Sequence, residues 1–300
     1  MALNKEIWVG TILENFIPNN SFAAQSVDHS EFVNGKTVHV PNAGSGAAIQ
    51  KNRSTLPATI GTRTDVDLSY PLNVFTSDPL RTEKLVEVEL SYDKRTSLIG
   101  QTKENLQNAV MEDILFSWVP ASPAKVETSG AATASYIPTA TGDRKAMTKA
   151  DVLAVKVKMD KDGVPAEGRY MLLDAVMYNQ LLNDLTNAET MNFLAGANVE
   201  TGVVGQYLGF QFYMRGEVLK ASSAGVLKAW TAGAAASDCA AGLAWQKGCV
   251  SRAIGEVSVF EDAENPQYYG DIISMGMRAG GSSIRSDKKG VVLIYQGTAA

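Results

Sequence analysis

Two histidines, His29 and His39, are the side chains best suited to acid–base chemistry near neutral pH. Both lie in an extended N-terminal region that has no predicted core of its own. A catalytic base needs a pocket that fixes its position. We therefore interpret both as solvated or interface histidines and not as catalytic residues.

Carboxylates gather in a second place, where Glu261, Asp262 and Glu264 precede Pro266. A metal site would need more oxygen ligands at a defined spacing, so a solvated turn is the favoured interpretation. A hydrolase or transferase that uses Glu261 stays as a remote alternative. It would require a concave pocket in which the carboxylate pKa is raised.

The remaining candidate motifs are incomplete. Residues 42–46 lack the Lys-Ser/Thr of a phosphate loop, and the glycines of 202–209 lead into strand-like residues instead of a helix. Asp160 begins an acidic turn that lacks the distal ligands of a calcium loop. Cys239 and Cys249 lack the paired spacing of a zinc site. We expect no enzyme, no cofactor and no metal site.

Charge is partitioned between two segments. The basic loop, residues 41–64, contains Lys51, Arg53 and Arg63 and no acidic residue. The acidic segment, residues 255–271, contains no basic residue and holds Glu256, Glu261, Asp262, Glu264 and Asp271. Opposite patches on separate elements can set the register of self-association. Ordinary solvated surface charge is an equally open interpretation.

Composition limits the class of protein. The 300 residues are 45 % hydrophobic, enough for one large or two smaller domains. The 27 basic and 32 acidic residues give a formal net charge of -5, which argues against a dedicated nucleic-acid binder. No apolar run has the length of a membrane span and no signal peptide is visible. We expect a soluble chain made in the cytoplasm.

The N-terminal third predicts an arm, a long hairpin and a long helix. Strand patterns at 36–40 and 66–72 flank a stretch without helical period, and such an insert is usually functional. Asp93 is a candidate cap for a helix that ends before Pro120. Only the second half of that helix has the 3–4 spacing of a buried face.

The rest of the chain predicts mixed strands and helices. Thr148 with Asp151 forms a capping signature, and Asp174 is a cap that follows a buried strand at 169–173. Further strands are predicted at 203–208, 211–218, 255–260, 268–279 and 291–295. The fold class is α+β.

Taken in order, these elements resemble the major capsid proteins of tailed bacteriophages, which have the Hong Kong 97 fold. The resemblance lies in the arm, hairpin and single long helix, and in local patterns along the later chain. These patterns are at residues 148–151, 162–165, 169–174, 205–213, 269–271, 276–280 and 290–295.

The resemblance implies a division of the chain into four parts. They are an N-terminal arm (1–35), an extended hairpin loop (36–92), a P-domain (93–144 and 251–289) with its spine helix at 93–119, and an A-domain (145–250 and 290–300). The arm and hairpin would lie on neighbouring subunits.

The implied function is that of a structural subunit. It would assemble with itself into hexamers and pentamers of an icosahedral head in the virion, contact packaged double-stranded DNA non-specifically, and have no contact with a membrane. A portal is an expected partner. Some members of the family begin with a long cleavable scaffolding segment. Here the strand pattern begins near residue 31 and leaves no room for one, so we also expect a separate scaffolding protein. Cellular nanocompartment (encapsulin-like) shells share this fold and are the main alternative.

Overall fold

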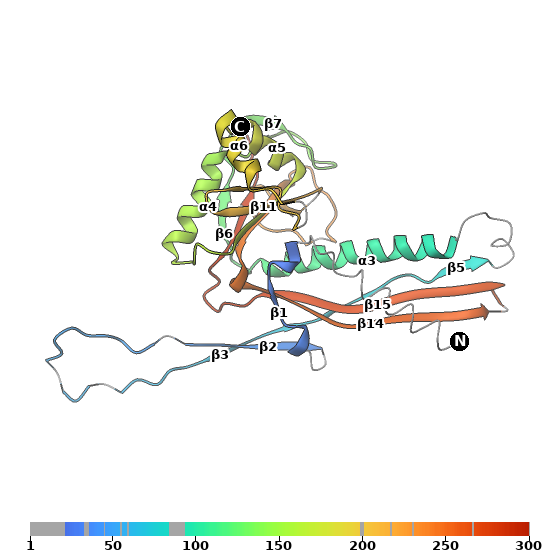
Figure 1. Cartoon of the computed structure of the whole chain (residues 1–300), viewed down its shortest axis with the longest axis horizontal. Helices are drawn as coiled ribbons and strands as arrows, with labels where there is room; N and C mark the ends of the chain where they lie inside the picture. Colours follow the sequence, from blue (N-terminus) through green and yellow to red (C-terminus); the bar gives the residue numbers. More distant parts are fainter. Residues whose placement is uncertain are drawn as a thin grey trace.

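The computed structural model describes residues 22–32, 36–44, 46–54, 56–58, 60–83, 94–198, 201–216, 218–229, 231–265 and 267–299. Two bodies and one projecting hairpin are visible in Figure 1. One body is rounded and is built on a seven-stranded sheet. The other is elongated and combines a five-stranded sheet with the long helix α3.

The rounded body has the strand order β10-β11-β9-β13-β16-β6, with β12 paired to β13. These strands are β6 (Ala124–Glu127), β9 (Arg169–Asp174), β10 (Gly205–Tyr207), β11 (Phe210–Arg215), β12 (Leu219–Ala221), β13 (Cys239–Gln246) and β16 (Val291–Tyr295). A two-stranded sheet of β7 (Ala132–Ala134) and β8 (Asp143–Lys145) lies beside it. The central strands β9 and β16 are buried throughout, as expected for strands covered on both faces.

Three helices cover one face of the seven-stranded sheet: α4 (Lys149–Lys161), α5 (Ala175–Asp184) and α6 (Asn187–Ala195). The predicted caps of α4 and α5 are present. Asp151 Oδ2 accepts the backbone N–H of Thr148 at 2.8 Å, and Asp174 Oδ1 accepts those of Val176 and Met177. These bonds satisfy N–H groups that a helix start leaves without partners.

The elongated body has the strand order β1-β14-β15-β4, and β5 continues beside β15. Its strands are β1 (Val27–Asp28), β4 (Asn73–Thr76), β5 (Leu80–Glu83), β14 (Val250–Asn265) and β15 (Gly270–Ser283). The helix α3 (Lys94–Trp118) runs along one face of this sheet. Short 3-10 helices occur at Phe22–Ala24, Ser30–Phe32 and Lys247–Cys249.

Helix α3 confirms the prediction that the second half of this helix has a buried face. Its buried side chains recur every three or four residues: Leu106, Val110, Met111, Ile114, Leu115 and Trp118. They pack on the inward side chains of β14 and β15, such as Val259 and Met275. The helix ends at Trp118, just before Pro120, as predicted; Asp93 lies outside the described residues.

Aromatic rings join the two bodies at the end of α3. Trp118 contacts Trp245 of β13, with ring centroids 5.3 Å apart, and Phe22 packs edge-on against both. The indole N–H of Trp118 donates to the carbonyl of Ser251 at 2.8 Å. One hydrophobic core therefore continues from the long sheet into the rounded body.

The projecting hairpin pairs β2 (Thr37–Asn42) with β3 (Val66–Pro71). The ladder occupies only a small part of the hairpin predicted at 36–92, because pairing stops at Asn42 and Val66. Residues 73–83, predicted as part of the hairpin, form β4 and β5 in the long sheet instead. Most residues of the loop between Asn42 and Val66 are small or polar and offer few cross-strand side-chain pairs to extend the ladder.

One predicted strand is longer than expected, and the four-part division is not tested. The predicted strand at 255–260 is part of the much longer β14. The pairing of β14 with β15 shifts register between Ile254 and Val257 and between Asp262 and Asn265. Strand β6 pairs with β16 in the seven-stranded sheet, although the proposed division assigns 93–144 to the P-domain. The four-part division itself stays a prediction.

Candidate assembly surfaces

The hairpin carries an exposed apolar and basic loop away from both bodies (Figure 1). Ile49, Leu56 and Ile60 are 96, 79 and 93 % exposed. Lys51 and Arg53 are exposed among them and form no ion pair with another described residue. Large apolar side chains exposed together are typical of interaction sites.

Arg63 differs from the other two basic residues. Its Nε lies 2.6 Å from Oδ1 of Asp65, the first residue after the basic loop, and Asp65 also accepts the backbone N–H of Gly44. The hydrogen bond from the Gly44 N–H, followed by the Arg63 guanidinium, lowers the pKa of Asp65 below its usual value. Arg63 therefore has a partner within its own hairpin, and sequence reasoning assigned no role to Asp65.

The acidic segment spans the far part of β14, the turn and the start of β15. Asp262 is exposed and accepts the Asn265 amide at 2.6 Å, while Glu261 is half-buried. Asp271 is buried beside β5. The side chains of Glu256 and Glu264 lie outside the described residues. The predicted acidic patch is thus only partly a surface patch.

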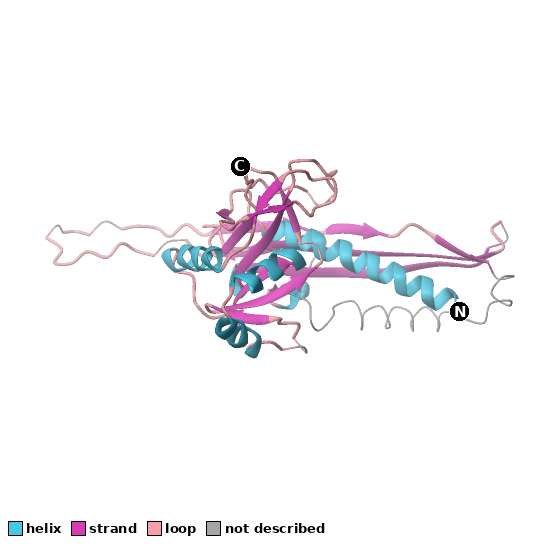
Figure 2. Cartoon of the chain, turned by 90° about the horizontal axis from the view of Figure 1, so that it is seen from above, coloured by secondary structure: helices cyan, strands magenta, loops and turns pink. Residues whose placement is uncertain are grey.

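Within one chain the basic loop and the acidic segment lie at opposite ends of the molecule (Figures 1 and 2). The start of β14 meets the hairpin root, where Ala253 packs with Val38 and Tyr70. Its far end pairs with β15 near Gly270, beside β5. At about 3.3 Å per residue, β14 separates the two ends by roughly 50 Å. The two charged segments cannot meet inside one subunit.

The outer face of the long sheet, on the side away from α3, is occupied at one end and exposed at the other. Near the hairpin root, Leu72 and Pro71 lie over Gly280. Further along the same face, Phe260 and Val74 are 58 and 60 % exposed. Between them lies Gly276, where an added Cβ would be 3.6 Å from the Phe260 ring. Sequence reasoning missed this surface because strand alternation does not say which face is covered.

Comparison with known proteins identifies the family. The family model described as phage capsid protein matches residues 24–296 of this chain. The chain belongs to the phage capsid protein family. The sequence-based resemblance is thereby confirmed, and the subunit is a structural capsid protein; the family match favours this over a nanocompartment shell. Among curated protein sequences, none matches this chain significantly.

Solved capsids share the fold of this capsid protein at low sequence identity. The capsid of Ralstonia phage GP4 superposes with a TM-score of 0.63 at 11 % identity, covering 94 % of this chain and 89 % of that one. Cyanophage P-SCSP1u gives 0.62 at 17 % identity, covering 90 and 86 %. The asymmetric unit of cyanophage Pam1 gives 0.62 at 14 % identity, covering 95 and 94 %.

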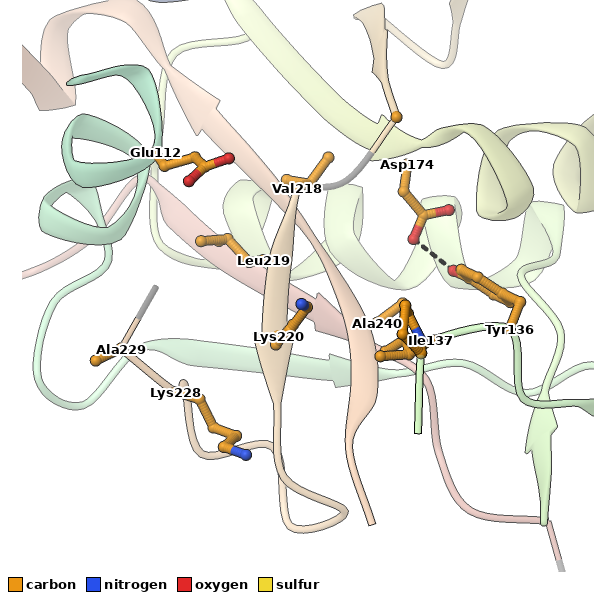
Figure 3. A pocket seen from close by; sticks show the side chains of 12 residues that line it. Glu112, Tyr136, Ile137, Asp174, Val218, Leu219, Lys220, Lys228, Ala229 and Ala240 are labelled. Carbon is orange, nitrogen blue, oxygen red and sulfur yellow. Dashed lines mark hydrogen bonds between the residues drawn. The ribbon is translucent and has the colours of Figure 1, made fainter. Parts of the chain in front are cut away.

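A cavity of about 240 Å³ lies in the capsid protein where α3 meets the edge of the rounded body. Figure 3 shows Glu112, Lys220 and Lys228 around it, with the Tyr136 hydroxyl donating to Asp174. The side chains already have partners: Lys228 Nζ is 2.8 Å from Asp238, and Asp174 caps α5. Burial, then the Asp174 charge, raises the pKa of Tyr136 far above its usual value. Because these lining side chains already have partners, we interpret the cavity as part of the junction between α3 and the rounded body and not as a binding site.

The enzyme alternative gains no support from these sites. Neither this cavity nor the groove between β4 and α3 is lined by a residue of the acidic segment. In the described residues, no group of three or more His, Cys, Asp or Glu side chains could hold a metal ion. No described helix is both long and apolar enough to cross a membrane.

Proposed function

We propose that this capsid protein is the major subunit of an icosahedral phage head and assembles into hexamers and pentamers around double-stranded DNA. The observation that carries the proposal is the hairpin, which projects from the subunit with its apolar loop exposed. A loop with no core in its own chain gains one by lying on the next subunit.

The second half of the proposal concerns where the hairpin lies. The exposed stretch around Phe260 and Val74 offers two apolar side chains. Asp262 follows Phe260 by two residues on β14, and Arg278 of β15 is paired opposite Val74. The two apolar side chains and Asp262 complement Ile49, Ile60 and the basic residues of a neighbour's loop. Because the hairpin loop and the surface that would receive it lie at opposite ends of one chain, the contact is head-to-tail. Such contacts form closed rings when the rotation from one subunit to the next closes, as hexamers and pentamers require.

Apolar burial supplies the driving force for this contact. Removing apolar area from water contributes about 25 cal/mol per Å2, from which the costs of ordering and association are subtracted. Each contact is therefore weak by itself. A closed shell forms because every subunit makes several such contacts at once.

Shortening the hairpin tests the proposal. Residues 43–65 are replaced by Asn-Gly, a dipeptide that closes two-residue hairpin turns; the β2–β3 ladder ends just outside the deleted segment. We expect a folded subunit that forms no closed shells, judged by circular dichroism and electron microscopy. A second variant keeps the length of the hairpin and replaces Ile49, Leu56 and Ile60 with Ser. It should also impair assembly, because the apolar side chains and not the length of the loop supply the contact. Normal particles from both variants would overturn the proposal.

The expected partners follow from the same proposal. A portal complex and a separate scaffolding protein would act with the subunit during assembly, and packaged DNA would touch the shell without sequence preference. The net charge of -5 is consistent with the absence of a dedicated nucleic-acid site. Purified particles should contain double-stranded DNA. Particles that contain only protein cargo would favour the nanocompartment alternative.

A further inference from the structure

Three segments that are distant in the sequence meet at the root of the hairpin. Strand β1 pairs in parallel with the start of β14, and the backbone N–H of His29 donates to the carbonyl of Arg252 at 2.8 Å. Tyr70 of β3 is buried against Ala253 of β14. The direction in which the hairpin leaves the body is set at this junction.

A chain of hydrogen bonds crosses the junction. The Ser251 hydroxyl donates to the Tyr70 oxygen at 3.2 Å, and the Tyr70 oxygen lies 3.3 Å from Nδ1 of His29. A phenol has a single proton to donate. The Ser251 hydroxyl also has a single proton, and its second acceptor, the Ser282 carbonyl, is more distant at 3.4 Å. With the shorter Ser251 bond going to Tyr70, we assign the phenol proton to Nδ1, which accepts it only when that nitrogen is unprotonated. The arrangement therefore fits the neutral imidazole.

The charged groups around the junction are two carboxylates and one guanidinium. Among the described residues, Asp28 and Glu31 lie on the same segment as His29, Arg252 lies on β14 and Tyr70 on β3. Asp28 Oδ2 is 3.0 Å from Nη2 of Arg252, which offsets its charge. Burial lowers the pKa of His29 below its ordinary value of 6.5, although Asp28 acts in the opposite direction. Burial likewise raises the pKa of Tyr70.

We propose that His29, Tyr70 and Ser251 form a proton-sensitive latch that holds the root of the hairpin against the body. Protonation of His29 places a hydrogen on Nδ1, so that two donors face the Tyr70 oxygen and the phenol proton loses its acceptor. The latch is closed at neutral pH. It weakens as pH falls below about 6.5, the ordinary histidine value, toward the lower value of the folded state.

Hydrogen exchange of the full-length, unassembled chain tests the latch, and its outcome does not depend on shell formation. Exchange is followed in peptides covering 36–42 and 66–72 at about pH 7.5 and about pH 5, on either side of the ordinary histidine pKa, after correction for the intrinsic rate. We expect protection at the hairpin root to fall several-fold on acidification. Peptides from the buried strand β9 should show no such change.

Two variants assign the effect. His29→Gln keeps an acceptor for Tyr70 but does not titrate, so the pH step should vanish. His39→Gln is the matched control: His39 is the other histidine of the chain, exposed on β2 with Nδ1 2.8 Å from Asp67, and its loss should leave the step intact.

A third variant guards against failure of the first to fold. Tyr70→Phe keeps the buried ring and removes the hydroxyl, so it should show reduced protection at both pH values and no step. The proposal is overturned if the original chain shows no pH step at the hairpin root. It is also overturned if the step persists in His29→Gln or Tyr70→Phe, or disappears in His39→Gln.

Discussion

At the scale of single residues, the rounded body depends on close approaches that leave no spare volume. Gly205 of β10 lies against Phe193 of α6, which is fully buried and packs edge-on against Phe212 with ring centroids 5.2 Å apart. A Cβ at Gly205 would lie 2.1 Å from the Phe193 ring. The glycine is required there by packing, since its φ is not positive.

Replacing this glycine should therefore destabilise the subunit. Overpacking of a filled core costs typically about 1–3 kcal/mol, so Gly205→Ala should lower the free energy of unfolding by that amount in a denaturant titration. Gly233→Ala is the control, because an added Cβ there meets no atom within 4 Å. Equal stability of both variants would contradict the packing argument.

A second residue-scale prediction concerns Glu189, the third residue of α6. Its carboxylate accepts the backbone N–H of Thr186 at 2.9 Å and lies 3.0 Å from Nζ of Lys149. The Thr186 bond, followed by the lysine, lowers the pKa of Glu189 to about 2. The stabilisation is fully present above the ordinary value of 4.5 and is lost as pH falls toward about 2.

Lys149→Met should raise the pKa of Glu189, measured by NMR titration, but leave it below the ordinary value because the Thr186 bond persists. Lys156→Met is the control, since Lys156 pairs with Asp160 and does not contact Glu189. An unchanged Glu189 pKa in Lys149→Met would show that the lysine has no part in the shift.

At the scale of elements, α3 is held to the long sheet by its second half. Beyond the apolar stripe, the Asn73 amide of β4 donates to Asp113 at 2.7 Å, and Asp113 is itself buried. The second half of the helix and the long sheet therefore pack as one unit.

Shortening one of the buried apolar side chains of α3 should lower the free energy of unfolding. Ile114→Ala should lower the free energy of unfolding by about 2–5 kcal/mol through lost burial and a cavity. Asn108→Ala, on the exposed face of the same helix, should change it by no more than about 0.5 kcal/mol. Urea titration of both proteins gives the comparison; similar losses would place Ile114 outside the core.

At the scale of the whole molecule, the separation of basic loop and acidic segment makes each subunit bipolar. Charge complementarity between copies adds specificity and association rate more than affinity. Lys51 and Arg53 are the best candidates for an intersubunit role, because Arg63 is already paired with Asp65. Exposed pairs of this kind are weakened by salt.

Charge reversal tests the pairing. Lys51→Glu with Arg53→Glu should slow assembly measured by light scattering, most strongly at low salt. Adding Glu261→Lys and Asp262→Lys should restore part of the rate. Arg63→Glu alone serves as the comparison, since its partner lies in the same hairpin, and should have the smaller effect on assembly. If the variant with all four substitutions assembles no faster than the variant with two, the acidic segment is not the partner of the basic loop.

Features set by neighbours in the chain were predictable. The capping residues Thr148 and Asp174 and the stop of α3 before Pro120 depend on hydrogen bonds within a few residues. The half-wet, half-buried pattern of α3 follows from side-chain spacing alone. The order of these elements carried the resemblance to phage capsid proteins, which the family match confirmed.

Features set by long-range pairing were not predictable. The pairing of β6 with β16, the transfer of residues 73–83 from the hairpin to the long sheet, and the contact of His29 with Tyr70 all join distant parts of the chain. Periodicity shows that a strand has two different faces but does not show what covers each. The sequence by itself determined the caps, the half-buried long helix and the resemblance to the family. Only the tertiary structure decided that the two charged segments lie at opposite ends and that Phe260 and Val74 are left exposed on the outer face of the long sheet, because both depend on contacts between residues far apart in the chain.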